Sequence, residues 1–131
     1  MYVLDTNTVA YFFRGEGRVA ERLLTTPPRE IAIPAIATYE LRYGLARIPK
    51  ATRRAEQLET LLSWVTILPF DDSVSHVAAN IRVELERAGR PIGPLDVLIA
   101  ATTLAANGTL VTRNVSEFDR VPNLRVENWY D

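Results

Sequence analysis

Residues 2–15 read YVLDTNTVAYFFRG, and this stretch decides the fold class. The segment Tyr2–Leu4 is aromatic, β-branched and apolar without alternation, which is typical of a short strand buried on both faces. The apolar run then stops at Asp5, Thr6 and Asn7 before aromatic residues follow. A carboxylate, a hydroxyl and an amide at the end of a buried strand either cap the next helix or form the edge of an active site.

Similar short apolar runs recur along the chain and alternate with segments of helical period. The expected strands are Tyr2–Leu4, Ile31–Ile33, Val65–Leu68, Leu110–Thr112 and Leu124–Val126. Short apolar strands that alternate with helices indicate an α/β fold around a parallel sheet. Ligands in such sheets bind outside the carboxyl ends of the strands, and Asp5 follows one of those ends.

Two helices have clear terminal signals. Ser73 is expected to cap the helix that follows it, and Gly89 is expected just past the end of that helix. The last long helix is expected to begin at Gly93-Pro94, since proline suits the first turn, and to stop at Asn107-Gly108.

The composition is ordinary for one globular domain, which we expect to span residues 1–131. Hydrophobic residues make up 47% of the chain and charged residues 24%. No apolar run approaches the roughly 18 residues of a membrane span, and no secretory signal is visible at the N-terminus. We therefore expect a cytoplasmic protein. Cysteine is absent, which excludes disulfides and thiolate metal sites.

The charge balance is nearly even, at a formal net charge of −1, which does not indicate a nucleic-acid-binding protein. However, Lys50 is the only lysine, so that nearly all positive charge is arginine. Arginine binds phosphate through a planar fork that lysine lacks. A genomic base bias explains an arginine-rich composition equally well, and the composition does not choose between these explanations.

Three acidic residues depart from the solvated surface pattern: Asp5 at a strand end, Glu40 in ATYELRYG, and Asp96 in GPLDVLIAA. Each lies beside a surface that should face the core, where an unpaired carboxylate is costly. Taken singly, Asp5 could cap a helix, Asp96 could complement a helix dipole, and Glu40 could lie at a helix boundary in water. Their coincidence favours convergence, because Asp5 and Glu40 follow strands that end at the same edge of the sheet.

Converging carboxylates need shared protons or a cation, since two of them about 4 Å apart repel by ~4 kcal/mol at an effective dielectric constant near 20. Oxygen ligands without cysteine or a nearby histidine favour Mg²⁺ or Mn²⁺ over zinc. His76, the only histidine, falls in a segment of surface-helix type, where we expect it to face solvent. A hard divalent cation that activates water and polarises a phosphate is the most economical chemistry.

Several motifs together resemble those of the PIN-domain ribonucleases, specifically the VapC toxins of bacterial VapBC toxin–antitoxin pairs. They are, in order, DTN, ATYELRYG, RAGRPIGPLDVLIAATTLAANGTLVTRNVSEFDRV and PNLRVENWYD, and they extend over Tyr2–Tyr130. DTN alone is a weak signal, whereas the ordered set is specific. The resemblance implies a three-layer α/β/α domain with a central parallel sheet of about five strands, and an acidic pocket that holds Mg²⁺ or Mn²⁺.

The resemblance also implies roles for individual residues. Asp5, Glu40 and Asp96 match the three core acids of the family, with Asp5 and Asp96 anchoring the metal. Many relatives carry Asp where this chain has Asn114, so the fourth acid is expected to be Glu117 with Asn114 assisting, and Asp119 is the alternative. The supporting polar groups are Thr6, Asn7, Thr112 and Asn114. For Thr6, Asn7 and Thr112, helix capping or a strand end is an equally good explanation.

Substrate and partners follow from the same resemblance. The family cleaves structured RNA, either transfer RNA in the anticodon stem-loop or a ribosomal RNA loop, and GRPIGPLD with the EF and ENW endings favours initiator transfer RNA. A small VapB antitoxin covers the site in this family, and the toxin usually forms a homodimer. Candidate RNA-binding residues are Arg14, Arg42, Arg47, Arg90 and Arg113, although Arg42 and Arg47 could instead face solvent or the antitoxin.

Other classes fit less well. A phosphotransfer receiver module needs paired acids after its first strand and a lysine after its fifth, but only Asp5 follows the first strand and no lysine follows Lys50. A dehalogenase-type phosphatase needs Asp-x-Asp, and the second position here is Asn7. A non-catalytic PIN module that binds RNA or protein remains the alternative, although such a module is expected to have lost acids that this chain keeps.

Overall fold

The computed structural model describes residues 1–131, and its centre is a five-stranded sheet with the strand order β3-β2-β1-β4-β5. All neighbouring strands are parallel. The strands are β1 (Tyr2–Leu4), β2 (Ile31–Pro34), β3 (Thr66–Leu68), β4 (Thr109–Val111) and β5 (Arg125–Glu127). All five expected strands are present, and their ends lie within one residue of the expected ends.

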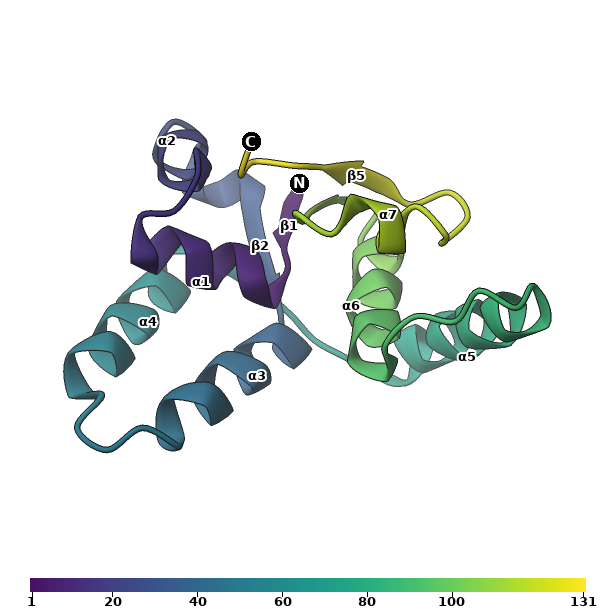
Figure 1. Cartoon of the computed structure of the whole chain (residues 1–131), viewed down its shortest axis with the longest axis horizontal. Coiled ribbons are helices and arrows are strands. Elements are labelled where there is room, and N and C mark those ends of the chain that lie inside the picture. Colours follow the sequence, from purple (N-terminus) through teal and green to yellow (C-terminus); the bar gives the residue numbers. More distant parts are fainter.

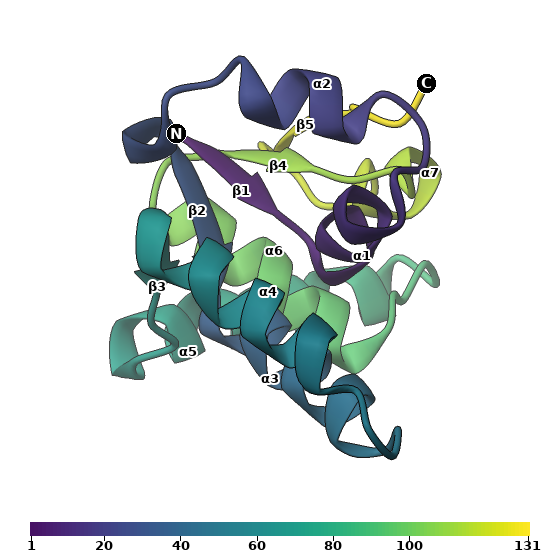
Figure 2. The same cartoon turned by 90° about the vertical axis from the view of Figure 1, so that its left-hand side faces the viewer.

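Helices cover both faces of this sheet, which confirms the α/β/α architecture. Figure 1 shows α1, α2 and α4 on the left of the strands and α5, α6 and α7 on the right. Figure 2, turned by 90°, shows α4 in front with α3 behind it. The helices are α1 (Thr6–Arg14), α2 (Val19–Leu24), α3 (Ala35–Ala46), α4 (Thr52–Trp64), α5 (Asp72–Arg87), α6 (Pro94–Ala105) and α7 (Val115–Phe118), with a 3₁₀ turn η1 at Pro28–Glu30. None of these helices has the length and apolarity needed to span a bilayer.

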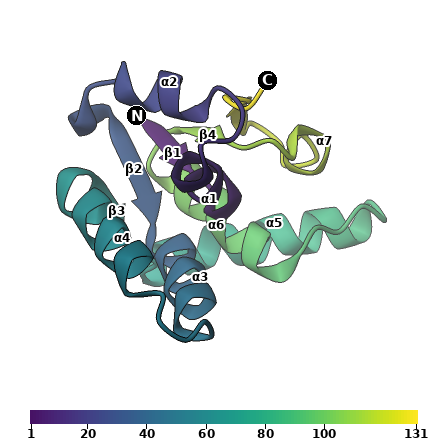
Figure 3. The ribbon, with the colours of Figure 1, turned by 60° about the vertical axis from the view of Figure 1, so that its left-hand side comes forward.

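The three inner strands, β2, β1 and β4, are buried because helices pack on both of their faces. Val3, Leu4 and Leu110 are completely inaccessible to solvent, as is Ile33 of β2, and they belong to one continuous cluster of 24 buried hydrophobic residues. β1 runs directly into α1 and β2 runs directly into α3 (Figure 3). Polar residues just beyond these strands are therefore held on a rigid scaffold at one edge of the sheet.

The helix-end predictions had mixed outcomes. The N-cap of α5 is Asp71, whose side chain accepts a hydrogen bond from the backbone N–H of Val74, so the prediction of Ser73 was wrong. Ser73 instead donates its hydroxyl to Asp71 Oδ1 at 2.7 Å. Gly89 lies just past α5 with φ of +68°, as predicted, and α6 begins at Pro94 with Gly93 as its N-cap.

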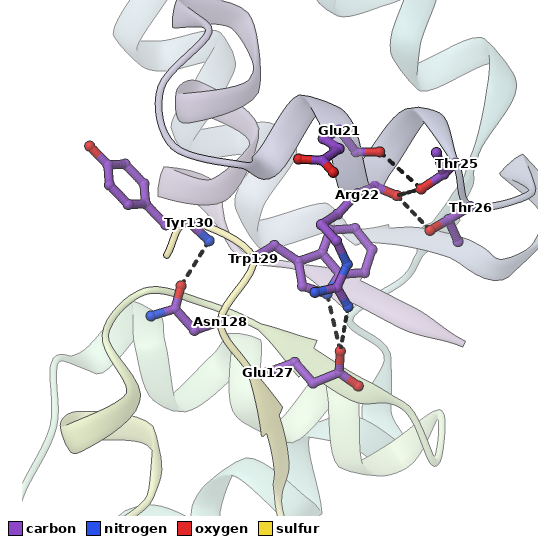
Figure 4. Close-up of polar contacts among 8 residues, drawn as sticks. All are labelled: Glu21, Arg22, Thr25, Thr26, Glu127, Asn128, Trp129 and Tyr130. Carbon is purple, nitrogen blue, oxygen red and sulfur yellow. Dashed lines mark hydrogen bonds and ion pairs between the residues drawn. The ribbon is translucent and has the colours of Figure 1, made fainter.

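The C-terminal segment folds back against α2 (Figure 4). Trp129 is buried, and its indole Nε1 donates to Glu127 Oε1 at 3.1 Å, while Arg22 of α2 pairs with the same oxygen at 3.4 Å. The backbone N–H of Arg18 donates to the carbonyl of Tyr130 at 2.9 Å. The last residues are thereby fixed beside the N-terminal half of the chain.

Candidate active site

The site begins between β1 and β4, where the order in which successive strands are added to the sheet changes side. The connection from β1 leads to β2 on one side, whereas β4 leads to β5 on the other, so the carboxyl ends of β1 and β4 border a topological switch point. Asp5 follows β1 and Thr112 follows β4, and both side chains are buried. The backbone N–H of Asp5 donates to the carbonyl of Val111 at 3.2 Å, which continues the β1–β4 pairing up to the site.

Asp5 is both a helix cap and a member of the acidic cluster. Its Oδ1 accepts a hydrogen bond from the backbone N–H of Thr8 at 2.9 Å, and its carboxylate also accepts one from the Thr112 hydroxyl. Burial raises the pKa of Asp5 above its ordinary value, the hydrogen bonds from Thr112 and Thr8 oppose that rise, and the charge of Glu40 adds to it. Asp5 therefore caps α1 as expected, and this contact is compatible with its predicted place in an active site.

Thr8 is a residue that sequence reasoning missed. Its backbone N–H donates to Asp5 Oδ1, and its hydroxyl donates to the carbonyl of Val111 at 3.0 Å. Thr8 therefore joins the start of α1 to the end of β4. The signal was available in the spacing, because the third residue after a capping aspartate offers the N–H that the cap accepts. A threonine at that position adds a hydroxyl on the buried side of the helix.

Glu40 reaches the same edge from the neighbouring element. It lies in the second turn of α3, which starts directly after β2, and its side chain is half-buried. Its Oε1 accepts a hydrogen bond from the Thr6 hydroxyl at 2.7 Å. The first turn of α1 thus supplies Asp5 as the cap and Thr6 as the group that orients Glu40.

Asp96 and Glu117 complete the cluster from the other face of the sheet. Asp96 lies in the first turn of α6, and its carboxyl is hydrogen-bonded to that of Glu117 on α7. Burial, followed by the charge and the hydrogen bond of Glu117, raises the pKa of Asp96 to about 7, with smaller contributions from Asp5 and Glu40. The structure therefore brings Asp5, Glu40, Asp96 and Glu117 within electrostatic reach of one another.

Glu117 is fixed by two further contacts. Its Oε1 accepts a hydrogen bond from the backbone N–H of Gly93 at 3.1 Å, and its Oε2 accepts one from the Asn114 amide. The backbone N–H of Asn114 in turn donates to the Thr112 hydroxyl at 3.0 Å. Gly93 was also missed from the sequence, where Gly93-Pro94 indicated only a helix start; a Cβ there would lie 3.4 Å from Asp96 Oδ2.

Comparison with known proteins identifies the family. The model of the PIN domain family matches residues 2–124. Ribonuclease VapC2 of Rickettsia felis is 37% identical over 131 residues, with 98% of each chain covered. The chain belongs to the VapC family of PIN-domain proteins. The tRNA(fMet)-specific endonuclease VapC of Salmonella typhimurium is 30% identical over 128 residues, with 98% of this chain and 97% of that protein covered.

A solved structure agrees with these sequence matches. The crystal structure of VapBC2 from Rickettsia felis, bound to a DNA fragment from its promoter, has a TM-score of 0.89 at 37% identity and covers 98% of both chains. The PIN-like fold and the VapC family expected from the sequence motifs are thus confirmed.

Membership of the PIN-domain family implies a divalent metal, and the donor set of this chain fits one. Burial is the main cause that raises the pKa values of Asp5 and Asp96, and neighbouring carboxylates add to the rise, so a bound cation would stabilise their anions. No three acidic or histidine side chains are gathered closely enough to hold an ion among themselves. Mg²⁺ does not require such a cage, because it keeps several waters and binds proteins through one or two carboxylates. Asp5 and Asp96 are the pair expected from the sequence.

The remaining predicted site residues divide into two groups. Thr6, Thr112 and Asn114 each hydrogen-bond to one of the four acids. Asn7 is exposed on the first turn of α1, and Asp119 is exposed just beyond α7, with no hydrogen bond from either side chain to the acids. The roles of all these residues in catalysis remain predictions.

The predicted RNA-binding arginines lie in different environments. Arg42 is paired with Glu59 of α4 at 3.0 Å, and Arg14 is paired with Glu16 at 3.2 Å. Arg113 lies over the ring of Tyr130 at 3.7 Å from its centroid, and Arg47 lies over the ring of Tyr43 at 5.1 Å. Arg90 is exposed in the segment that follows α5. His76 is exposed on α5, as expected.

Proposed function

We propose that this PIN domain is a toxin that cleaves structured RNA with Mg²⁺, or Mn²⁺, as its cofactor. The observation that carries the proposal is the convergence of Asp5, Glu40, Asp96 and Glu117 at the switch point of the sheet, from four separate elements. Four carboxylates in such proximity are a liability for stability. A bound cation would offset this repulsion and could bring a phosphodiester to the carboxylates.

Each acid has a separate task in this proposal. Asp5 and Asp96 hold the cation, for which Asp96 must release the proton that it retains below about pH 7. Glu40 and Glu117 orient water through their carboxylates, Glu40 being positioned by Thr6, and Glu117 by Gly93 and Asn114. The cation, when bound, lowers the pKa of water and offsets the charge that develops on the phosphate.

Transfer RNA is the proposed substrate class, with initiator transfer RNA first among its members. The relatives from Salmonella typhimurium and Shigella flexneri are both named tRNA(fMet)-specific endonuclease, and each is 30% identical to this chain over 128 residues. The GRPIGPLD motif, which contains Asp96, favours the same group. A ribosomal RNA loop is the alternative substrate.

A VapB-type antitoxin is the proposed partner. Solved structures of relatives from Rickettsia felis and Salmonella typhimurium are VapBC complexes bound to DNA, and the chains that match this one are covered at 98% and 97%. We propose that this chain likewise forms a homodimer that an antitoxin neutralises in the cytoplasm. RNA would then be cleaved only by toxin released from that complex.

Cleavage of defined RNAs tests the proposal. Purified protein is incubated with initiator transfer RNA, an elongator transfer RNA and a ribosomal RNA loop, in Mg²⁺, in Mn²⁺ or in excess chelator, and 5′ ends are sequenced. We expect one dominant cut in the initiator anticodon loop, none with chelator, and a loss of about 10²-fold or more in Asp96→Asn. Asp72→Asn, at an exposed residue of α5, is the control.

The opposite results are equally clear. Cleavage that persists in chelator would contradict the metal mechanism. Cleavage confined to the ribosomal loop would show that ribosomal RNA, and not transfer RNA, is the substrate. If the wild-type protein binds RNA in Mg²⁺ and in Mn²⁺ but cuts none of the three, the non-catalytic alternative is correct.

A further inference from the structure

A hollow of about 340 Å³ lies beside the acidic cluster, between α1, α3 and the start of α4. Its volume lies in the range of about 300–1,000 Å³ that is common for sites of small ligands. We call it the Gly44 hollow, and its walls combine apolar and cationic side chains: Phe13, Leu41 and Leu45 with Arg14, Arg47 and Arg54. Glu40, which also lines it, connects the hollow to the acidic cluster through Thr6.

Two of the three arginines of the hollow, Arg47 and Arg54, are available to an anion, whereas Arg14 is paired with Glu16. Arg47 and Arg54 form no ion pair; their guanidinium groups lie over the rings of Tyr43 and Phe13, at 5.1 and 5.3 Å from the ring centroids. Stacking on an aromatic face orients a guanidinium without neutralising it. Arg42, which also lies on α3, differs because its guanidinium already donates two hydrogen bonds to the carboxylate of Glu59.

Gly44 keeps this hollow open. It lies in the interior of α3, where glycine is less stable than alanine because it loses more conformational freedom on folding. Its φ is not positive, and a Cβ built there would meet nothing within 4 Å. Neither backbone conformation nor packing therefore requires glycine at this position. A side chain here would project into the space that the hollow provides.

We propose that the Gly44 hollow binds one nucleotide of the RNA substrate next to the scissile phosphodiester, and this rests on the proposed function. The base lies against Phe13, Leu41 and Leu45, and its phosphate is held by Arg47 and Arg54. An unpaired nucleotide suits this combination, because a base offers a flat apolar face while its phosphate offers charge to arginine. The acidic cluster then acts on the neighbouring linkage from the Glu40 side.

Binding measured in chelator tests the charge of the hollow without depending on cleavage. The probe is a fluorescein-labelled anticodon stem-loop of initiator transfer RNA, and its anisotropy is followed in excess chelator at several salt concentrations. Arg54→Gln is expected to weaken binding about tenfold and to reduce the slope of log K against log salt by about 0.7, the value for one phosphate contact on a single strand. Arg53→Gln, at the exposed neighbour outside the hollow, is expected to change affinity by less than about twofold. Equal effects of the two variants would overturn the proposal.

Filling the hollow tests its shape. Gly44→Leu is expected to unfold at the same temperature as the wild type or higher, yet to raise KM for the stem-loop at least about tenfold while kcat stays within about twofold. Gly44→Ala, which adds one methyl group, is expected to give the same gain in stability with a smaller rise in KM. A folded Gly44→Leu with wild-type KM would overturn the proposal.

Two outcomes separate this inference from its alternatives. If the wild-type protein cuts no RNA, the proposed function fails, whereas the chelator binding series still reports on the hollow. If Gly44→Leu keeps wild-type RNA affinity and KM but no longer binds its antitoxin, the occupant is a protein segment and the nucleotide assignment is wrong.

Discussion

The carboxyl groups of Asp96 and Glu117 are hydrogen-bonded to each other, although they belong to helices that come from different connections of the sheet. One of two hydrogen-bonded carboxyls must carry a proton, and the pKa of Asp96, raised to about 7 by burial and by the charge of Glu117, reflects a proton that the pair shares. The pair therefore changes charge near neutral pH, within the range in which a bound cation would replace the proton.

Stability of the metal-free protein should fall as pH rises. The folded-state pKa of Asp96 is raised from 3.8 to about 7, so the stabilising contribution is complete below pH 4 and is lost as pH rises through 7. The full shift would correspond to about 4 kcal/mol, and partial exposure to solvent reduces the expected change to about 2 kcal/mol. In the presence of chelator, the melting temperature of the protein should therefore be about 6 °C lower at pH 8 than at pH 5.

The control for this pH effect is Asp96→Asn, which cannot ionise. Its melting temperature in chelator should depend much less on pH across the same interval. A wild-type protein that gains stability between pH 5 and pH 8 would show that the acidic pair does not hold its proton in the folded state.

Glu117, and not Asp119, should be the fourth acid. Glu117 is hydrogen-bonded to Asp96, Gly93 and Asn114, whereas Asp119 is exposed at the end of α7. Glu117→Gln should lower kcat/KM for RNA by about 10²-fold, as expected for loss of a group that acts on the reacting water. Asp119→Asn should cut at the wild-type rate. If Asp119→Asn lowers kcat/KM and Glu117→Gln does not, Asp119 is the fourth acid.

Much of this fold follows from local pattern. The five strands were predictable because buried parallel strands appear as short runs without polar interruption, and the turn residues between them are marked by proline and glycine. The cap of α5 was not predictable from such a pattern. Asp71, Asp72 and Ser73 are all good capping residues in a row, and only the approach of the chain from β3 determines which one meets the N–H of Val74.

The acidic cluster was only partly predictable. Asp5 and Glu40 could be placed at one edge because each follows a strand, and parallel strands share their carboxyl end. The contacts of Glu117 were not accessible, since they depend on how α7 folds over the start of α6 and on a backbone N–H at Gly93. Likewise Arg54 carried no local signal, because it reaches the Gly44 hollow only through the packing of α4 beside α1 and α3.

Loss of the Thr112 hydroxyl should weaken metal binding without unfolding the protein. Thr112 donates to Asp5 and accepts from the backbone N–H of Asn114, so Thr112→Val removes a hydrogen bond that favours the Asp5 anion. The pKa of Asp5 should rise further. Affinity for Mn²⁺, measured by calorimetry at pH 8 in a protein that keeps Asp96, should fall about 10-fold to 100-fold.

Two companion variants isolate this effect. Thr112→Ser keeps the hydroxyl and should retain most of the affinity. Thr103→Val removes an equally buried hydroxyl that only bonds the Ile99 carbonyl within α6, and it should leave Mn²⁺ affinity unchanged. Equal losses in the valine variants at positions 112 and 103 would indicate a general effect of packing.

Tyr130 should contribute to RNA affinity by holding Arg113 beside the site. The guanidinium of Arg113 lies 3.7 Å from the centroid of the Tyr130 ring, and Tyr11 packs edge-on against that ring at 4.8 Å. Tyr130→Ala should raise KM about fivefold with kcat nearly unchanged, because a freely rotating arginine loses more conformational entropy when it binds phosphate. Tyr130→Phe keeps the ring and should behave as the wild type. The double variant Arg113→Gln/Tyr130→Ala should raise KM no further than Arg113→Gln alone, and additive increases would show that Tyr130 acts on RNA binding by another route.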